Sequence, residues 1–173
     1  RRLPNAEVTL TTNASPLTEQ KLVKLSAFKR IGYLWISFND HRPDEYEKTM
    51  QLPYRRTIER LDMIHQKKAE GLFDFRVVLS RVGDGSQVDT DFRSWVAANY
   101  PLFEHSVFAK SNWLGQVESD ADCNPPPNVG CTRWFDVSIT STGVVAHCCV
   151  DGNAEYPIGD VKKQHVLEIY NSA

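Results

Sequence analysis

The chain has 173 residues, enough for one domain with a substantial core or for one domain with a small appendage. Its 20 Lys and Arg residues nearly balance its 22 Asp and Glu residues, so the composition does not favour a nucleic acid or another polyanion as a partner. The apolar runs are too short to cross a bilayer, so we expect no membrane partner and a cytoplasmic location.

Strand-like and helix-like segments alternate over the first 110 residues. The strand-like segments are rich in apolar or β-branched residues and cover residues 6–12, 33–37, 75–80 and 105–111. Helical patterns begin near Pro16, Pro53 and Ser86, which are residue types typical of helix starts. The continuous apolar run at 33–37 is typical of a strand covered on both faces. The alternation predicts βαβ units with a parallel sheet, which is an α/β fold.

In a parallel α/β fold, the loops that follow the strands gather on one rim, where ligands bind. These loops are TNAS, SFNDHR, SRVGDG and KSNWLG. The residue type alone leaves two roles open for Ser37, a cap of the next segment or a ligand contact. Asn13 is equally well explained as a turn residue. Trp113, in the last loop, is a candidate for a ligand contact at the rim.

The character of the sequence changes after Trp113. A loop rich in proline leads to an alternating pattern at residues 133–140, which predicts a half-buried strand. The turn residues that end at Gly143 and the apolar segment after them predict a β-hairpin, and we expect a short helix at residues 162–170. The chain therefore divides into two expected domains, residues 1–115 and residues 116–173.

All four cysteines lie in the second expected domain, as Cys123, Cys131, Cys148 and Cys149. The residues alone leave three interpretations open. Adjacent cysteines cannot easily form a disulfide with each other because the linking peptide is strained, but Cys148 could pair with an earlier cysteine in an oxidising compartment. A zinc site usually has a Cys-x2-4-Cys knuckle, which is absent here. An iron–sulfur cluster places less demand on knuckle spacing.

The segment Cys131-x11-Gly143-x4-Cys148, followed by Cys149, Asp151 and the phrase IGDVKKQHVLEIYNS, resembles the start of a SPASM domain. This domain is the auxiliary iron–sulfur module of many radical S-adenosylmethionine (SAM) enzymes. The earlier segments VTLTTNASPLT and LWISFNDHRPDEYEKTM resemble barrel strands of the same enzymes. The resemblance implies that residues 1–115 form the second part of a partial (β/α)6 radical SAM barrel. Residues 116–173 would then begin a small Cys-rich SPASM-like module.

Two motifs of the radical SAM family are absent from the chain. One is the Cys-x3-Cys-x2-Cys loop that binds the catalytic cluster, and the other is GGEP. Since the chain starts at Arg1 and stops in a helical pattern at Ala173, we expect an internal fragment of a longer enzyme. The alternative is a degenerate relative that has lost catalysis. We expect the 173 residues alone to be inactive, and we assign no catalytic residue among them.

The resemblance implies that Cys123, Cys131 and Cys148 bind an auxiliary 4Fe-4S cluster, with a fourth ligand from beyond the chain or from the substrate. We expect strand alternation to turn Cys149 away from this cluster. His147 next to Cys148 is a weaker candidate because the same alternation turns it away. The rival interpretation is a non-catalytic α/β scaffold whose Cys-rich module holds zinc or a disulfide.

The resemblance also implies a SAM site on the rim of the sheet. Ser37 would hydrogen-bond SAM, and Asn39 would face SAM or the substrate, while Thr12 and Asn13 would line the same rim. The intact parent would bind SAM and a second 4Fe-4S cluster. Its expected partners are a peptide, protein or small-molecule substrate and an electron donor such as flavodoxin or ferredoxin.

Overall fold

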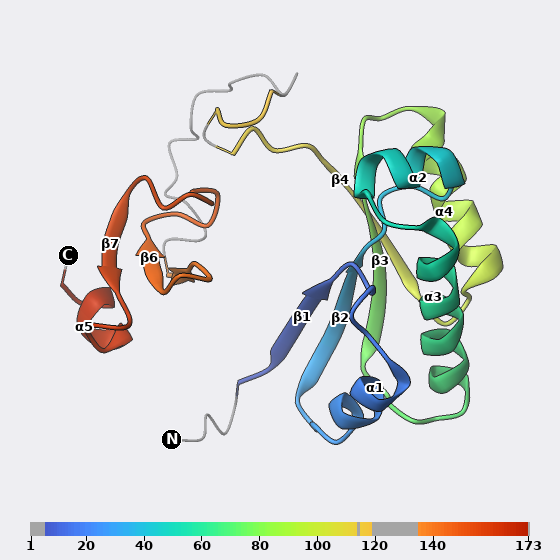
Figure 1. Cartoon of the computed structure of the whole chain (residues 1–173), viewed down its shortest axis with the longest axis horizontal. Helices are drawn as coiled ribbons and strands as arrows, with labels where there is room; N and C mark the ends of the chain where they lie inside the picture. The colour runs from blue at the N-terminus through green and yellow to red at the C-terminus, as the bar shows by residue number, and fades with distance from the viewer. Residues whose placement is uncertain (1–5, 114, 119–134, 173) are drawn as a thin grey trace. The chain divides into compact units, whose positions relative to one another are not determined.

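The computed structural model describes residues 6–113, 115–118 and 135–172 of the chain. The chain divides into two compact units, Arg1–Ala109 and Lys110–Ala173, which we describe separately (Figure 1). Two predicted cluster ligands, Cys123 and Cys131, lie outside the described residues. No helix in the described part of the chain is long and apolar enough to cross a membrane.

The first unit contains a four-stranded parallel sheet with the strand order β1-β2-β3-β4. Its strands are β1 (Val8–Thr12), β2 (Ile31–Ser37), β3 (Arg76–Gly83) and β4 (Glu104–Ala109). The connections contain the helices α1 (Glu19–Ser26), α2 (Pro43–Met50), α3 (Tyr54–Ala69) and α4 (Gln87–Asn99), which all lie on one side of the sheet (Figure 1). The predicted parallel α/β fold is confirmed. The four strands form an open sheet, and the partial barrel stays a prediction.

The core of the first unit lies between the sheet and its helices. Leu34 and Ile36 alternate along β2 with residues of the opposite face, and Leu61 and Ile64 follow helical spacing on α3. All four side chains are at most 1% exposed. Fully burying a side chain of this size contributes about 1.5–3 kcal/mol. This layer therefore fixes the strand ends on which the candidate site depends.

The opposite face of the sheet is not covered by any described helix of this unit. Tyr33, Trp35 and Ser37 of β2 lie on this face, as does Phe108 of β4, which is 45% exposed. The ring centroids of Trp35 and Phe108 are 6.2 Å apart, and those of Tyr33 and Trp35 are 6.1 Å apart. The apolar run of β2 predicted cover on both faces. Within the described part of this unit, helices cover only one.

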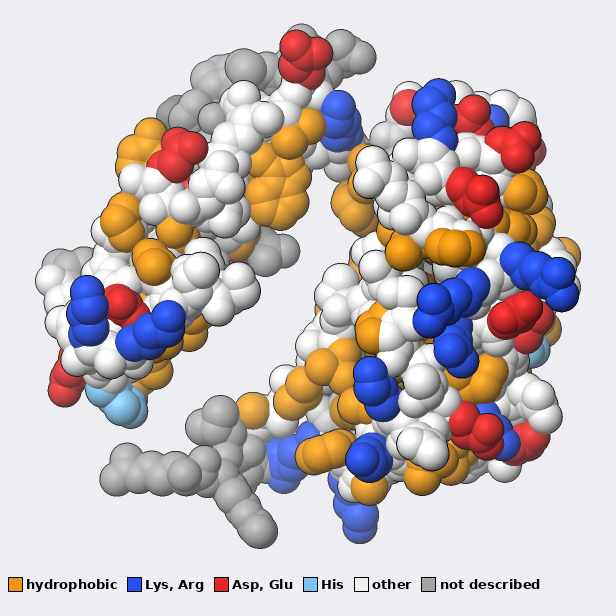
Figure 2. Space-filling view, in the orientation of Figure 1, with side chains coloured by type: hydrophobic (Ala, Val, Ile, Leu, Met, Phe, Trp, Pro, Cys, Tyr) orange, Lys and Arg blue, Asp and Glu red, His pale blue; other side chains and the backbone are white. Residues whose placement is uncertain are grey.

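Charged side chains of both signs are interspersed on the helical side of the first unit (Figure 2). Some form pairs along one helix, such as Arg55 with Glu59 at 3.3 Å. Exposed pairs of this kind contribute little to stability. The arrangement agrees with the balanced charge of the sequence and gives no surface of a single sign on this side.

The second unit contains a three-stranded antiparallel sheet in the order β5-β6-β7. Its strands are β5 (Ser138–Ile139), β6 (Val144–Ala146) and β7 (Pro157–Asp160). The β5–β6 turn places Gly143 at a φ of 88°, a conformation that glycine adopts without strain. The predicted hairpin is confirmed, but its first strand is shorter than residues 133–140. Within the described residues, Ser138 and Ile139 form the ladder with β6, and Thr140 donates its backbone N–H to the carbonyl oxygen of Val144 at 2.9 Å where the turn begins. Residues 133–134 lie outside the described part.

The last helix, α5 (Val166–Tyr170), is also shorter than the predicted range of 162–170. It begins after His165, whose Nδ1 accepts a hydrogen bond from the backbone N–H of Leu167 at 3.3 Å. Glu168 completes the cap by accepting from the backbone N–H of His165 at 3.3 Å. Before the cap, Asp160 accepts from the backbone N–H of Lys162 at 2.9 Å and holds a turn there.

Candidate functional site

The carboxyl ends of the strands form the rim on which ligand contacts were predicted. Ser37 ends β2 beside Ser80 of β3, and Ser80 lies beside Ser106 of β4. Because strand residues alternate between faces, these serines share the face that the helices leave uncovered. Ser80 Oγ donates a hydrogen bond to the carbonyl oxygen of Ile36 at 3.2 Å. A row of hydroxyl groups therefore crosses three neighbouring strands at this level of the sheet.

Thr12 and Ser37 end neighbouring parallel strands, as predicted. Their side chains nevertheless lie on opposite faces of the sheet. Thr12 shares its face with Leu10, which packs into the helix-covered core. The Oγ1 atom of Thr12 accepts a hydrogen bond from the backbone N–H of Ala14 at 3.2 Å. Thr12 thus shapes the β1–α1 turn, and its contact with a cofactor stays a prediction.

Asn13 forms a local turn after β1. Its Oδ1 atom accepts hydrogen bonds from the backbone N–H of Ser15 at 3.1 Å and from the Ser15 hydroxyl at 2.7 Å. Between them, Ala14 is fully buried at a φ of 64°, which is unusual for a residue with a side chain. The turn role that the residue type allowed for Asn13 is therefore realised. A contact between Asn13 and SAM stays a prediction.

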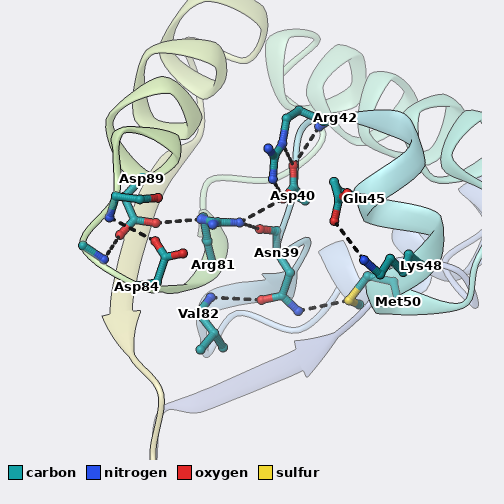
Figure 3. Close-up of polar contacts among 12 residues, drawn as sticks. Asn39, Asp40, Arg42, Glu45, Lys48, Met50, Arg81, Val82, Asp84 and Asp89 are labelled. Atoms are coloured by element: carbon teal, nitrogen blue, oxygen red, sulfur yellow. Dashed lines mark hydrogen bonds and ion pairs between the residues drawn. The ribbon is translucent and has the colours of Figure 1, made fainter. Parts of the chain in front are cut away.

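Asn39 follows β2 in a left-handed conformation with a φ of 63°. Its Oδ1 atom accepts a hydrogen bond from the backbone N–H of Val82 at 3.0 Å, and its Nδ2 atom lies 3.0 Å from Sδ of Met50 (Figure 3). Both ends of the side-chain amide are therefore used to link the β2–α2 loop to β3 and α2. A contact from Asn39 to SAM or to the substrate stays a prediction.

Sequence reasoning missed Arg81, whose side chain is only 9% exposed near the end of β3. Its guanidinium donates to the carbonyl oxygen of Asn39 at 2.5 Å, to Asp40 at 3.1 Å and to Asp89 at 2.7 Å (Figure 3). Arg81 thus joins the loop after β2 to the first turn of α4. The available signal was an arginine inside the apolar segment VVLSRVG, since a buried charge requires paired partners.

The two carboxylates of this network are held in their charged form. Burial acts to raise the pKa of Asp40, but the hydrogen bonds and charge of Arg42 and the charge of Arg81 outweigh it, so the pKa lies below its ordinary value. Burial also acts to raise the pKa of Asp89, but hydrogen bonds from Arg81 and from the backbone N–H of Gly85 lower it below its ordinary value. The network is therefore fully charged at neutral pH.

The second unit places two of the predicted site residues in the loop between β6 and β7. We call residues 147–156 the cysteine loop. The backbone N–H of His147 donates to the carbonyl oxygen of Tyr156 at 3.0 Å and closes its base. Cys148 and Cys149 are free, half-buried thiols. β6 ends at Ala146, so both cysteines lie beyond the strand. The prediction that they belong to a strand whose alternation turns Cys149 away from Cys148 is therefore wrong.

The predicted cluster ligands are only partly within the described residues. Cys123 and Cys131 lie outside them, so their convergence with Cys148 stays a prediction. In the described ranges, no three His, Cys, Asp or Glu side chains are grouped to hold a metal ion. The two described thiols nevertheless fit an iron–sulfur cluster, because they are unbridged, partly shielded from water and of the ligand type that such clusters use.

Trp113, the candidate for a rim contact, lies against the cysteine loop. A methyl group added at Gly152 would lie 3.8 Å from the Cε3 atom of the Trp113 ring, in ordinary van der Waals contact. Nearby, Gln116 donates from its side-chain amide to the carboxylate of Glu155 at 3.1 Å. The segment around Trp113 therefore packs on the loop that carries the cysteines, within the same unit.

Residues 131–173 match the SPASM family model, an iron–sulfur cluster-binding domain. The SPASM match includes Cys131, Cys148 and Cys149 together with β5, β6, β7 and α5 of the described residues. The predicted SPASM domain is confirmed for these residues and implies that they bind an iron–sulfur cluster. The parallel sheet lies outside the match, and the comparison with curated proteins finds none that matches the chain.

Proposed function

We propose that the chain is part of a radical SAM enzyme whose SPASM domain binds an auxiliary 4Fe-4S cluster. The observation that carries this proposal is the SPASM match at residues 131–173, which contains two free, half-buried thiols. The parallel sheet with helices on one side supports it, because SPASM domains occur in radical SAM enzymes and the sequence of this sheet resembles their barrel. The substrate is a peptide, a protein or a small molecule.

The residues that would hold the auxiliary cluster are Cys123, Cys131 and Cys148. In the intact parent, a second cluster that binds SAM would supply the reducing electron for radical chemistry on the substrate. The thiols of this chain would bind the auxiliary cluster and partly shield it from water. An electron donor such as flavodoxin or ferredoxin would reduce the intact parent enzyme.

The sheet of the first unit would supply part of the SAM site. Ser37 is the proposed hydrogen-bonding residue, since its hydroxyl lies at a strand end on the uncovered face. Asn39, Thr12 and Asn13 would act through the shape of the neighbouring loops, where their side chains already form hydrogen bonds. Arg81 would keep the loop after Ser37 in place through its hydrogen bonds to Asn39 and Asp40.

Metal analysis of the purified chain tests the proposal. The protein is prepared without oxygen and incubated with ferrous iron and sulfide, after which iron, acid-labile sulfide and zinc are measured. We expect iron and sulfide in similar amounts, with the brown absorption of an iron–sulfur cluster. A colourless protein that retains zinc, or one whose cysteines are disulfide-bonded, would contradict the proposal. Either result would support a non-catalytic scaffold whose Cys-rich module holds zinc or a disulfide.

Single cysteine variants locate the cluster within the chain. Replacing Cys131 or Cys148 by Ala should lower the iron content more than replacing Cys149, which is the matched control because it is adjacent to Cys148 and also half-buried. Equal iron loss in all three variants would show that Cys149 is also a ligand. Full iron content in Cys131→Ala would refute the proposed ligand set.

A further inference from the structure

The cysteine loop is built from two successive turns. The backbone N–H of Asp151 donates to the carbonyl oxygen of Cys148 at 3.1 Å, which closes the first turn. The backbone N–H of Ala154 donates to the carbonyl oxygen of Asp151 at 3.1 Å, which closes the second. Asp151 therefore belongs to both turns and is the residue through which one is connected to the other.

The Asp151 side chain joins the far end of the same loop. Its Oδ1 atom accepts a hydrogen bond from the backbone N–H of Glu155 at 2.8 Å, and its Oδ2 atom accepts one from the backbone N–H of Tyr156 at 2.9 Å. The residue is 2% exposed. Without the carboxylate these two donors would lose their partners within the chain, although Glu155 and Tyr156 are themselves exposed, so the main effect would be a looser loop.

We propose that Asp151 is a positioning residue for the cysteine thiols. This inference rests on the proposed function, because one of these thiols, Cys148, is a proposed ligand of the iron–sulfur cluster. The backbone N–H of Asp151 binds Cys148, and its carboxylate binds residues 155 and 156, so that Cys148 and Cys149 are held in one arrangement before any cluster binds. Groups that orient metal ligands in this way affect metal affinity although they do not touch the metal.

A matched control separates positioning from general support of the unit. Asp160 also accepts a backbone hydrogen bond with its carboxylate, from Lys162 at 2.9 Å. It lies at the end of β7, outside the cysteine loop. Replacing Asp160 by Ala removes the same kind of interaction from the same unit and leaves the loop bonds intact.

The first measurement needs no cluster. The metal-free chain is treated with iodoacetamide, and trypsin then yields peptide 111–133 with Cys123 and Cys131 and peptide 134–162 with Cys148 and Cys149. Asp151→Ala should alkylate several-fold faster in peptide 134–162, because the loop opens more often. The alkylation rate of Asp151→Asn should lie between those of Asp151→Ala and the unchanged chain, since the Asn amide retains one acceptor oxygen. The alkylation rate of this peptide in Asp160→Ala should equal that in the unchanged chain.

The second measurement uses the cluster. After incubation with ferrous iron and sulfide, Asp151→Ala should bind iron about tenfold more weakly than the unchanged chain. The electron paramagnetic resonance spectrum of its reduced cluster should also change, with partial recovery in Asp151→Asn. A change in loop stability that left the ligands in place would not alter this spectrum.

The outcomes distinguish the two proposals. If the unchanged chain binds no cluster, the proposed function fails, and the alkylation rates still decide whether Asp151 positions the thiols. Unchanged alkylation in Asp151→Asn, which preserves the shape of the side chain, would overturn the inference even if Asp151→Ala does not fold. Faster alkylation of the same peptide in Asp160→Ala would overturn it as well.

Discussion

Arg81 and Arg76 lie on the same strand and both pair with carboxylates, but their surroundings differ. Arg81 and its partners Asp40 and Asp89 are at most 9% exposed, whereas Arg76 and Glu104 are 62% and 49% exposed. Arg81→Met should lower the free energy of unfolding by about 3–5 kcal/mol, because it leaves the buried carboxylate of Asp89 without its ion-pair partner, whereas Asp40 keeps its pair with Arg42. The control Arg76→Met should lower the free energy of unfolding by less than about 1 kcal/mol. Urea denaturation of both variants measures this difference, and equal losses would contradict it.

The same carboxylates predict how stability depends on pH. Asp40 and Asp89 have pKa values below the ordinary range in the folded chain, so their contribution is present above the unfolded pKa of about 4 and is lost as the pH falls through the folded values. Thermal unfolding should therefore shift to lower temperature in acid below pH about 4. The shift should be smaller in Arg81→Met. A chain that became more stable on acidification would refute this sign.

At the scale of elements, the packing of α5 on β7 depends on a single glycine. A methyl group added at Gly159 would lie 2.6 Å from Cγ2 of Ile169, which is 2% exposed. Gly159→Ala should therefore destabilise the second unit by about 1–3 kcal/mol through overpacking. The control Gly152→Ala adds a methyl group in ordinary contact with the Trp113 ring and should be nearly neutral. Hydrogen exchange of α5 amides checks this, and similar exchange in both variants would contradict the close contact.

The elements that could be predicted from the sequence are those set by local pattern. The parallel strands and the hairpin turn at Gly143 follow from alternating segments and turn residues. The extent of β5 could not be predicted, since its length depends on its ladder with β6, a strand of three residues. The uncovered face of β2 was also missed, because an apolar run indicates that a face is buried but not which element buries it.

Site residues show the same division. Asn13 and Thr12 bond to backbone groups two residues along the chain, and the turn role of Asn13 is visible in its residue type. The partners of Asn39 on β3 and α2 are distant in sequence, so they could not be predicted. Cys148 and Cys149 were correctly placed after a hairpin. Their orientation was not predictable, because it depends on the turns of the cysteine loop.

At the scale of the whole molecule, the two units would contribute different parts of one enzyme. The first would offer strand ends for SAM, and the second offers thiols for an iron–sulfur cluster. All four cysteines of the chain lie at or after Cys123, and the three at Cys131, Cys148 and Cys149 fall within the SPASM match. The parallel sheet therefore has no cysteine of its own with which to hold a second cluster.

This distribution of cysteines predicts that the 173-residue chain alone does not cleave SAM. Cleavage in the radical SAM family requires a cluster on the Cys-x3-Cys-x2-Cys loop, and that spacing is absent from the sequence. The chain loaded with iron and sulfide, then reduced with dithionite and mixed with SAM, should form no more deoxyadenosine than the same mixture without protein. Measuring iron in the sample first ensures that the cluster of the second unit is present. Deoxyadenosine above this background, lost again in Cys148→Ala, would mean that the SPASM cysteines themselves hold a SAM-cleaving cluster, contrary to the division of roles between the two units.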